Sequence, residues 1–131
     1  MEKLKQKQEI FIKSLNALAR DLKNFEGNSN ENLKSSLVAS NIKHFEITFE
    51  ACKAYLQEII KSKFKKTLGG TTAIIKESFA LGIIDEQTSI DLLILLAERN
   101  ATAHEYIEES ADETCKRIKN HFSVFKKLEN L

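Results

Sequence analysis

The feature that most restricts the fold of this chain is its shortage of helix-breaking residues. The 131 residues contain no proline and only four glycines. Proline removes a backbone hydrogen bond and clashes with the preceding helical turn, and glycine costs helix stability through its backbone freedom. Long helices are the default for a chain that lacks both, so the sequence predicts an all-α fold.

Apolar residues recur at helical spacing in three long segments. In the first segment they step by threes and fours apart from a gap at Gln8, and the second and last segments trace similar stripes. They are Leu4, Phe11, Leu15, Leu18, Leu22 and Phe25; then Leu37, Ile42, Phe45, Phe49, Cys52, Leu56, Ile59 and Ile60; and finally Ile107, Ala111, Cys115, Ile118, Phe122, Phe125 and Leu128. Each segment is predicted to form one amphipathic helix.

Polar connectors separate the helical segments. Residues 27–30 read Gly-Asn-Ser-Asn, which favours a turn and an N-cap, and residues 67–72 contain paired glycines. A short helix is predicted over residues 73–81, and Asp85 is expected to cap the helix that follows it. Residues 90–96 are apolar on nearly all sides. That helix is therefore expected either to be central or to lie in a subunit interface.

Long helices joined by short connectors pack as antiparallel neighbours. We therefore expect one domain over residues 1–131, an antiparallel up-and-down bundle of four to five helices. The length of the apolar stripes also favours a homodimer that forms through helices.

The charge balance excludes a protein that binds polyanions over its whole surface. Twenty basic residues oppose nineteen acidic ones, which leaves a net charge of +1. Any contact with RNA must therefore come from a local patch, and Lys61, Lys63, Lys65 and Lys66 form the densest cluster. We take Lys63 and Lys66 as candidate substrate contacts. The alternative is that these lysines only neutralise the end of a helix.

The cysteines and histidines do not predict a metal site. Cys52 and Cys115 lie far apart within helical patterns, and His44, His104 and His121 do not add ligands at paired spacing. Buried free thiols are expected, with no metal and no cofactor. The chain shows neither a signal-peptide pattern nor a long apolar run, so we expect a cytoplasmic protein without a membrane contact.

Reactive side chains gather in residues 98–106, which read Glu-Arg-Asn-Ala-Thr-Ala-His-Glu-Tyr. Arg99 can hold a phosphate by two parallel hydrogen bonds, and histidine, present here as His104, is the side chain whose unperturbed pKa lies closest to neutral pH. On a continuous helix these two side chains would lie about 140° apart. They converge only if the helix breaks locally or if two subunits share the site.

The chemistry that fits these residues is RNA cleavage without a metal. The ribose 2′-hydroxyl would attack the adjacent phosphate, Arg99 would stabilise the developing charge, and His104 would act as general acid or base. Asn100 would orient the phosphate or the imidazole. The alternative is structural: Arg99 pairs with a carboxylate such as Glu46, Glu50 or Glu98, and the histidine caps a backbone group.

Three motifs give this segment its context. Residues 99–106 match the pattern Arg-x4-His-x-Tyr, residues 45–50 read Phe-Glu-Ile-Thr-Phe-Glu, and residues 74–85 form an apolar segment that ends Gly-Ile-Ile-Asp. Together they resemble the HEPN superfamily, and in particular the nucleotidyltransferase substrate-binding proteins, partners of minimal nucleotidyltransferases (MNT). One departure is Ala51-Cys52-Lys53-Ala54, where the family usually has Trp-Lys.

The resemblance implies a homodimer in which Arg99 and His104 of both protomers line a cleft. It implies a toxin that cleaves RNA, an MNT antitoxin as partner, and AMP transfer to Tyr106 in some members. The alternative is a subunit that binds a nucleotide or RNA without cleaving it and presents it to a nucleotidyltransferase. A purely structural bundle is a third interpretation.

Overall fold

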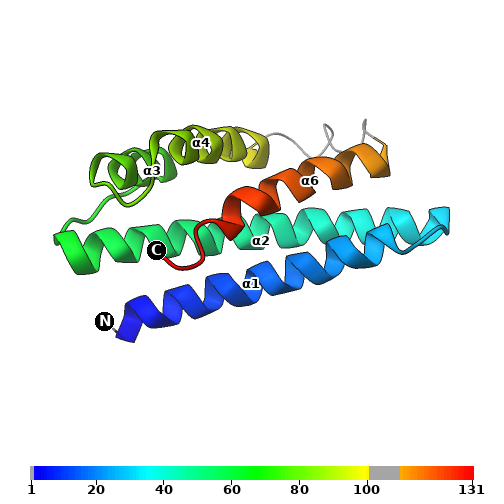
Figure 1. The fold of residues 1–131 in the computed structure, drawn as a ribbon, viewed down its shortest axis with the longest axis horizontal. Coiled ribbons are helices and arrows are strands. Elements are labelled where there is room, and N and C mark those ends of the chain that lie inside the picture. The colour runs from blue at the N-terminus through cyan, green and yellow to red at the C-terminus, as the bar shows by residue number, and fades with distance from the viewer. Residues whose placement is uncertain (1, 101–109) are drawn as a thin grey trace.

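Two long antiparallel helices form the base of the molecule. The computed structural model describes residues 2–100 and 110–131, and in it α1 (Glu2–Glu26) lies beside α2 (Glu31–Phe64) along most of their lengths (Figure 1). The six apolar residues of the predicted first stripe are all buried. This confirms the first two predicted helices, and the second ends at Phe64, close to the basic segment.

The boundaries of α2 follow from local hydrogen bonding. The Asn30 side chain accepts hydrogen bonds from the backbone N–H groups of Asn32 and Leu33, at 3.0 and 3.4 Å, and so caps the first turn. At the other end Lys65 takes a left-handed conformation with a φ of 57°, and its ammonium group donates to the Ser62 carbonyl at 3.1 Å. Such residues satisfy helix ends that would otherwise lack partners.

A helical hairpin covers one side of this pair. It consists of α3 (Thr71–Ala80) and α4 (Glu86–Asn100). Gly70 precedes α3 with a φ of 90°, a conformation that costs glycine little. The Asp85 side chain accepts a hydrogen bond from the Thr88 backbone N–H at 2.8 Å, which confirms the predicted cap of α4.

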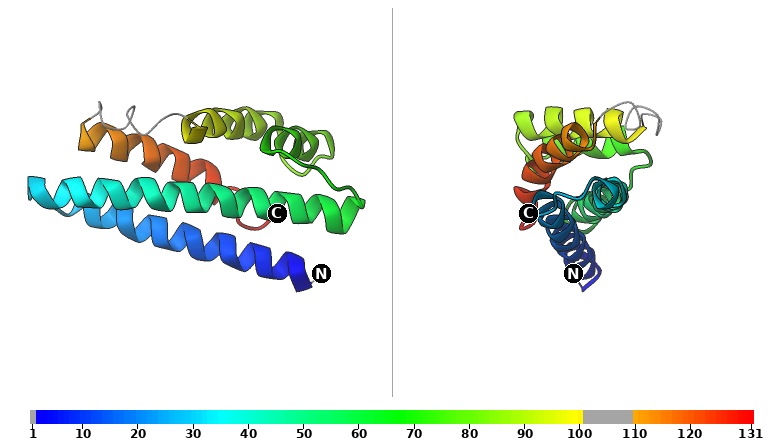
Figure 2. Two further views of the ribbon diagram at one scale, coloured as in Figure 1. Left: turned by 180° about the vertical axis from the view of Figure 1, so that it is seen from behind. Right: turned by 90° about the vertical axis from the view of Figure 1, so that its right-hand side faces the viewer.

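The last helix, α6 (Ala111–Lys126), packs against α1, α2 and α4. It runs in the direction opposite to α1 and α4, and the views from both sides agree on this (Figures 1 and 2). The order α1, α2, α4, α6 therefore runs up, down, up, down, with α3 as a short addition. This confirms the predicted all-α, antiparallel up-and-down bundle.

Aromatic rings join the long helices at the centre of the bundle. Phe125 of α6 lies 6.3 Å from Phe11 of α1, and 6.1 and 6.3 Å from Phe45 and Phe49 of α2, measured between ring centroids. Tyr55 extends the cluster, and its hydroxyl donates to the Leu131 carbonyl at 2.8 Å. Such ring pairs stabilise a core beyond the area they bury.

Helix α4 is buried on one side only. Leu92 and Leu95 are each 1% exposed, whereas Ile90 and Ile94 are 43% and 52% exposed. These exposures exclude the alternative in which this helix is central to one protomer. Its place in a subunit interface stays a prediction.

The two cysteines are buried and free, as expected. Burial raises the pKa of Cys52 to about 12, so its thiol is not ionised at neutral pH. Within residues 2–100 and 110–131, no helix combines the length and the apolar character that crossing a membrane requires.

Candidate active site

Arg99 lies in the last turn of α4, where it meets α2. One of its terminal nitrogens, NH2, is 3.0 Å from Glu50 Oε1, and both side chains are partly exposed, at 34% and 49%. Its Nε is buried and has no hydrogen-bond partner among the described residues. The guanidinium is therefore anchored by one carboxylate, and the exposed part of the side chain is what a phosphate oxygen could contact.

The position of Glu50 follows from the Phe-Glu repeat of α2. Phe45 and Phe49, four residues apart, lie on one face of the helix and enter the aromatic core. The glutamate after each phenylalanine is turned by about 100°, which takes it out of the core. The repeat thus fixes α2 in the core and places the Glu50 carboxylate in reach of Arg99. Of the three carboxylates considered as partners, the structure selects this one.

Glu98, the residue before Arg99, turns toward α6 instead. Its carboxylate is 3.6 Å from Arg117 NH2 and contacts His121 Nε2. Burial lowers the pKa of His121 below its ordinary value, while the neighbouring Glu98 carboxylate opposes this effect. A neutral imidazole donates its Nε2–H to Glu98, and this contact joins α4 to α6.

Sequence reasoning missed Arg117 and His121 as neighbours of this site. They are four residues apart on α6 and so share one face, and the available signal was this spacing. The apolar stripe directed attention to Phe122, yet His121 is the more buried of the two, at 8% exposure.

Asn100 is the last residue of α4 and is exposed. The structure therefore brings Arg99 and Asn100 to the same helix end. His104 and Tyr106 lie outside the described residues. The convergence of the histidine on the arginine stays a prediction.

The candidate lysine contacts lie apart from Arg99. Lys63 is thirteen residues beyond Glu50 on α2, which corresponds to about 20 Å along the helix axis. Lys66, in the connector after α2, pairs with Glu77 of α3 at 3.2 Å. The capping role of Lys65 agrees with the alternative in which part of this cluster stabilises a helix end. Substrate contact by Lys63 and Lys66 stays a prediction.

A second polar cluster joins α1 to α2 but cannot activate a nucleophile. The Ser40 hydroxyl donates to Asp21 Oδ2 at 2.6 Å, and the same oxygen contacts His44 Nδ1. In a serine–histidine–aspartate triad the serine and the carboxylate bind opposite ring nitrogens. Here Ser40 and Asp21 both face Nδ1, so the cluster ties the two helices together.

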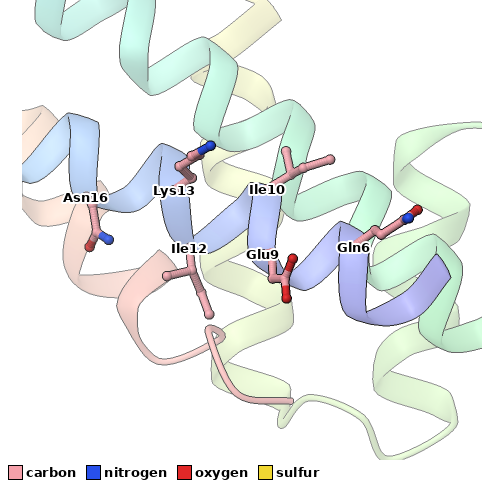
Figure 3. Close-up of a pocket in the computed structure, with 6 residues that line it drawn as sticks. All are labelled: Gln6, Glu9, Ile10, Ile12, Lys13 and Asn16. Carbon is pink, nitrogen blue, oxygen red and sulfur yellow. The ribbon is translucent and has the colours of Figure 1, made fainter. Parts of the chain in front are cut away.

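A cavity of about 450 Å³ lies on the outer surface of α1. Figure 3 shows that the labelled lining side chains, which include Glu9, Ile10 and Lys13, all come from this one helix. Catalytic pockets usually draw polar groups together from several elements. This cavity is therefore not a second candidate for the reactive site. Residues 2–100 and 110–131 contain no grouping of three potential metal ligands.

Residues 6–131 match the family described as "nucleotidyltransferase substrate binding protein like", which covers nearly the whole chain. The chain belongs to this family. The match confirms the resemblance to HEPN proteins of this type. A search of curated proteins found no match to the sequence.

Solved structures support the same assignment at the level of the fold. One is the crystal structure of a toxin–antitoxin with AMP-PNP, at 18% identity and a TM-score of 0.69, covering 92% of this chain and 95% of that one. Another is a tri-AMPylated HEPN toxin of Shewanella oneidensis in complex with an MNT antitoxin, at 19% identity and a TM-score of 0.70, covering 92% and 94%. At these identities the likeness shows a shared HEPN fold.

The Phe-Glu repeat that contributed to the resemblance has a structural role in this chain. In this HEPN-type bundle the repeat connects the core to the arginine at the end of α4. The family's Trp-Lys position is taken here by residues that include Ala51 and Cys52, which are 8% and 2% exposed. Small buried side chains therefore occupy the two positions of α2 that directly follow Glu50.

Proposed function

We propose that this protein is a HEPN-type toxin, a metal-independent endoribonuclease whose antitoxin is a minimal nucleotidyltransferase. The observation that carries the proposal is the position of Arg99. It stands at the end of α4, directly before the segment that contains His104, and it keeps a buried Nε without a partner among the described residues. Membership of the family and the fold shared with a HEPN toxin support the same proposal.

In the proposed reaction the ribose 2′-oxygen forms a bond to the adjacent phosphorus while the bond to the 5′-oxygen breaks. His104 takes the proton from the 2′-hydroxyl or supplies one to the leaving oxygen. Arg99 binds the phosphate oxygens as negative charge develops on them. Asn100, on the same helix end, orients the phosphate. No cofactor takes part in these steps.

The proposed site is shared by two protomers. The exposed side of α4 carries Ile90 and Ile94, which a second copy of the chain would cover. Parallel pairing along α4 would bring together the ends of two such helices, each with an Arg99. A homodimer formed in this way would supply the Arg99 side chains of both protomers to one phosphate. A single protomer supplies one arginine at the described end of α4.

Control by the partner is proposed to act at Tyr106. The phenolic oxygen would attack the α-phosphorus of ATP, the bond to pyrophosphate would break, and the phenolic proton would be released. The Shewanella oneidensis toxin with a similar fold is tri-AMPylated. After incubation with partner and ATP, intact-mass analysis should show adenylyl additions that the Tyr106→Phe variant lacks. Equal addition to both chains would exclude this tyrosine as the acceptor.

Growth of a bacterial host tests the toxin assignment. Expression of the chain alone should stop growth, and co-expression of the partner nucleotidyltransferase should restore it. Arg99→Ala and His104→Ala variants should be harmless, whereas Arg20→Ala, an exposed arginine of α1, should be as toxic as the parent. Variants of Arg99 and His104 that stop growth as the parent does would contradict the proposal.

The second candidate function is a non-catalytic subunit that presents a nucleotide or RNA to the nucleotidyltransferase. The Arg99–Glu50 pair favours it, since a guanidinium already neutralised on one side can bind phosphate without turning it over. This function predicts RNA binding without cleavage, and activity only after the partner is added.

A further inference from the structure

Four lysines from separate parts of the chain line one groove. Lys3 and Lys7 come from the start of α1, Lys61 from the end of α2, and Lys66 from the connector that follows. The groove has a volume of about 230 Å³. The antiparallel packing of α1 and α2 explains this convergence, because it places the start of one helix beside the end of the other (Figure 1).

The groove is strongly positive in a nearly neutral protein. Glu58 is the one carboxylate that lines it, against four ammonium groups, so the lining has an excess of three positive charges in a chain of net charge +1. Lys3 is 3.7 Å from Glu58, and Lys66 pairs with Glu77. Lys7 and Lys61 form no ion pair with any residue in the described part of the chain. Neither ammonium group is therefore held in a close ion pair, and Lys61 acts on Glu58 only through its charge.

The groove is held in shape without a ligand. The Gln57 side-chain amide donates a hydrogen bond to the Leu68 carbonyl at 3.0 Å, which fixes the connector against α2. The Ser62 hydroxyl donates to the Glu58 carboxylate at 2.8 Å, and this bond lowers the pKa of Glu58. The anionic Glu58 in turn holds Lys3 at the groove. Binding there would require little reordering of the backbone.

An exposed aromatic residue follows one of the lining lysines along α2. Phe64 is 40% exposed and lies one turn beyond Lys61 on α2. Proteins that bind single-stranded nucleic acids combine a positive groove for the backbone with aromatic rings on which bases stack. The lysines and Phe64 supply both parts, whereas a groove for a carboxylate ligand would have no use for an exposed ring.

The groove and Arg99 are reached from the same side of α2. Glu50, which anchors Arg99, and Lys61 are eleven residues apart, so they share a face of the helix at an axial separation of about 16 Å. Seen from behind, α2 lies in front of α6 and crosses the width of the molecule (Figure 2, left). A strand of about five nucleotides at duplex spacing, or fewer when extended, would connect the two places.

We propose that the groove formed by Lys3, Lys7, Lys61 and Lys66, with Phe64 beside it, binds the backbone of single-stranded RNA and leads the strand along α2 toward Arg99. This inference rests on the proposed RNA substrate. It includes Lys66 as a substrate contact, whereas Lys63 lies about 140° around α2 from the Glu50 face and is not part of the groove.

Binding measured without cleavage tests the groove separately from the catalytic proposal. An Arg99→Ala/His104→Ala chain serves as the background, titrated with a fluorescent single-stranded RNA of about ten nucleotides over a range of salt concentrations. Adding Lys7→Gln and Lys61→Gln should weaken binding and reduce the slope of log K against log salt by about 1.4, since each phosphate contact contributes about 0.7. Phe64→Leu should weaken binding about fivefold or more and leave the salt slope unchanged.

The matched control is Lys23→Gln/Lys116→Gln, which removes the same charge from exposed lysines at the other end of the bundle. Its salt slope should equal that of the background. Equal slopes for the two double variants, no RNA binding by the background, or binding of ATP as tight as that of the RNA would each overturn the groove. If the parent chain cleaves RNA but the two double variants have equal salt slopes, only the proposal for the groove is overturned. If binding depends on the groove lysines but the parent chain does not cleave RNA, only the ribonuclease proposal is overturned.

Discussion

At the scale of single residues, the anchoring of Arg99 decides what the site can do. A pair between two partly exposed side chains contributes little to folding, about 0–1 kcal/mol. Its value lies in orientation, because Glu50 holds one terminal nitrogen of the guanidinium while the Arg99 side chain stays partly exposed. In this account Glu50 is a positioning residue for Arg99.

The Glu50→Gln variant tests this role. We expect a melting temperature close to that of the parent and a fall in kcat for RNA cleavage on the order of tenfold, because the guanidinium loses its orientation. KM should change less than kcat. Glu46→Gln is the matched control, since Glu46 occupies the equivalent place in the first Phe-Glu pair and is exposed. Equal kcat values for the two variants would remove Glu50 from the mechanism.

His121 predicts a pH dependence of stability. Burial lowers its pKa in the folded state below the ordinary value of 6.5. As the pH falls through this value, the unfolded state takes up a proton first, so the contribution of His121 to stability is present above about pH 6.5 and is lost below it. The melting temperature should therefore fall between about pH 7.5 and 5.5 by more in the parent than in His121→Gln. An equal fall in both would show that the imidazole is not held neutral.

At the scale of elements, α4 combines a buried side with an exposed apolar one. Its sequence alone indicated burial on several sides, and one protomer buries Leu92 and Leu95 but leaves Ile90 and Ile94 exposed. A second protomer would account for the remaining face. The helix that carries Arg99 would then also form the dimer, which makes the site depend on assembly.

The Ile94→Glu variant tests this dependence. We expect it to convert a dimer to a folded monomer, measured by light scattering and circular dichroism, and to abolish RNA cleavage. Ile10→Glu is a matched control, because Ile10 on α1 has the same 52% exposure as Ile94. A dimer that persists in Ile94→Glu, or one that both substitutions disrupt equally, would contradict an interface on this face of α4.

At the scale of the whole molecule, the elements were predictable and their mutual contacts were not. The apolar stripe of α1, the Asn30 cap and the Asp85 cap depend on local spacing and short-range hydrogen bonds, which the sequence displays directly. The partner of Arg99 depends instead on how far α4 slides along α2. No local pattern distinguishes Glu50 from the other two carboxylates.

The same reason explains the two clusters that sequence reasoning missed. Glu98 meets His121 only because α6 crosses near the end of α4. Lys3 and Lys7 join Lys61 only because antiparallel packing places the start of α1 beside the last part of α2. Stripes predict which side of a helix is buried, whereas these contacts depend on the packing of whole helices against each other.

The measurement that tests the central claim most directly is cleavage of RNA by the purified chain in the presence of a metal chelator. The account predicts shortened RNA with 2′,3′-cyclic phosphate ends, and a loss of rate of about a hundredfold or more in folded Arg99→Ala and His104→Ala variants. RNA left intact by a folded, dimeric parent, or cut as fast by both variants, would contradict it.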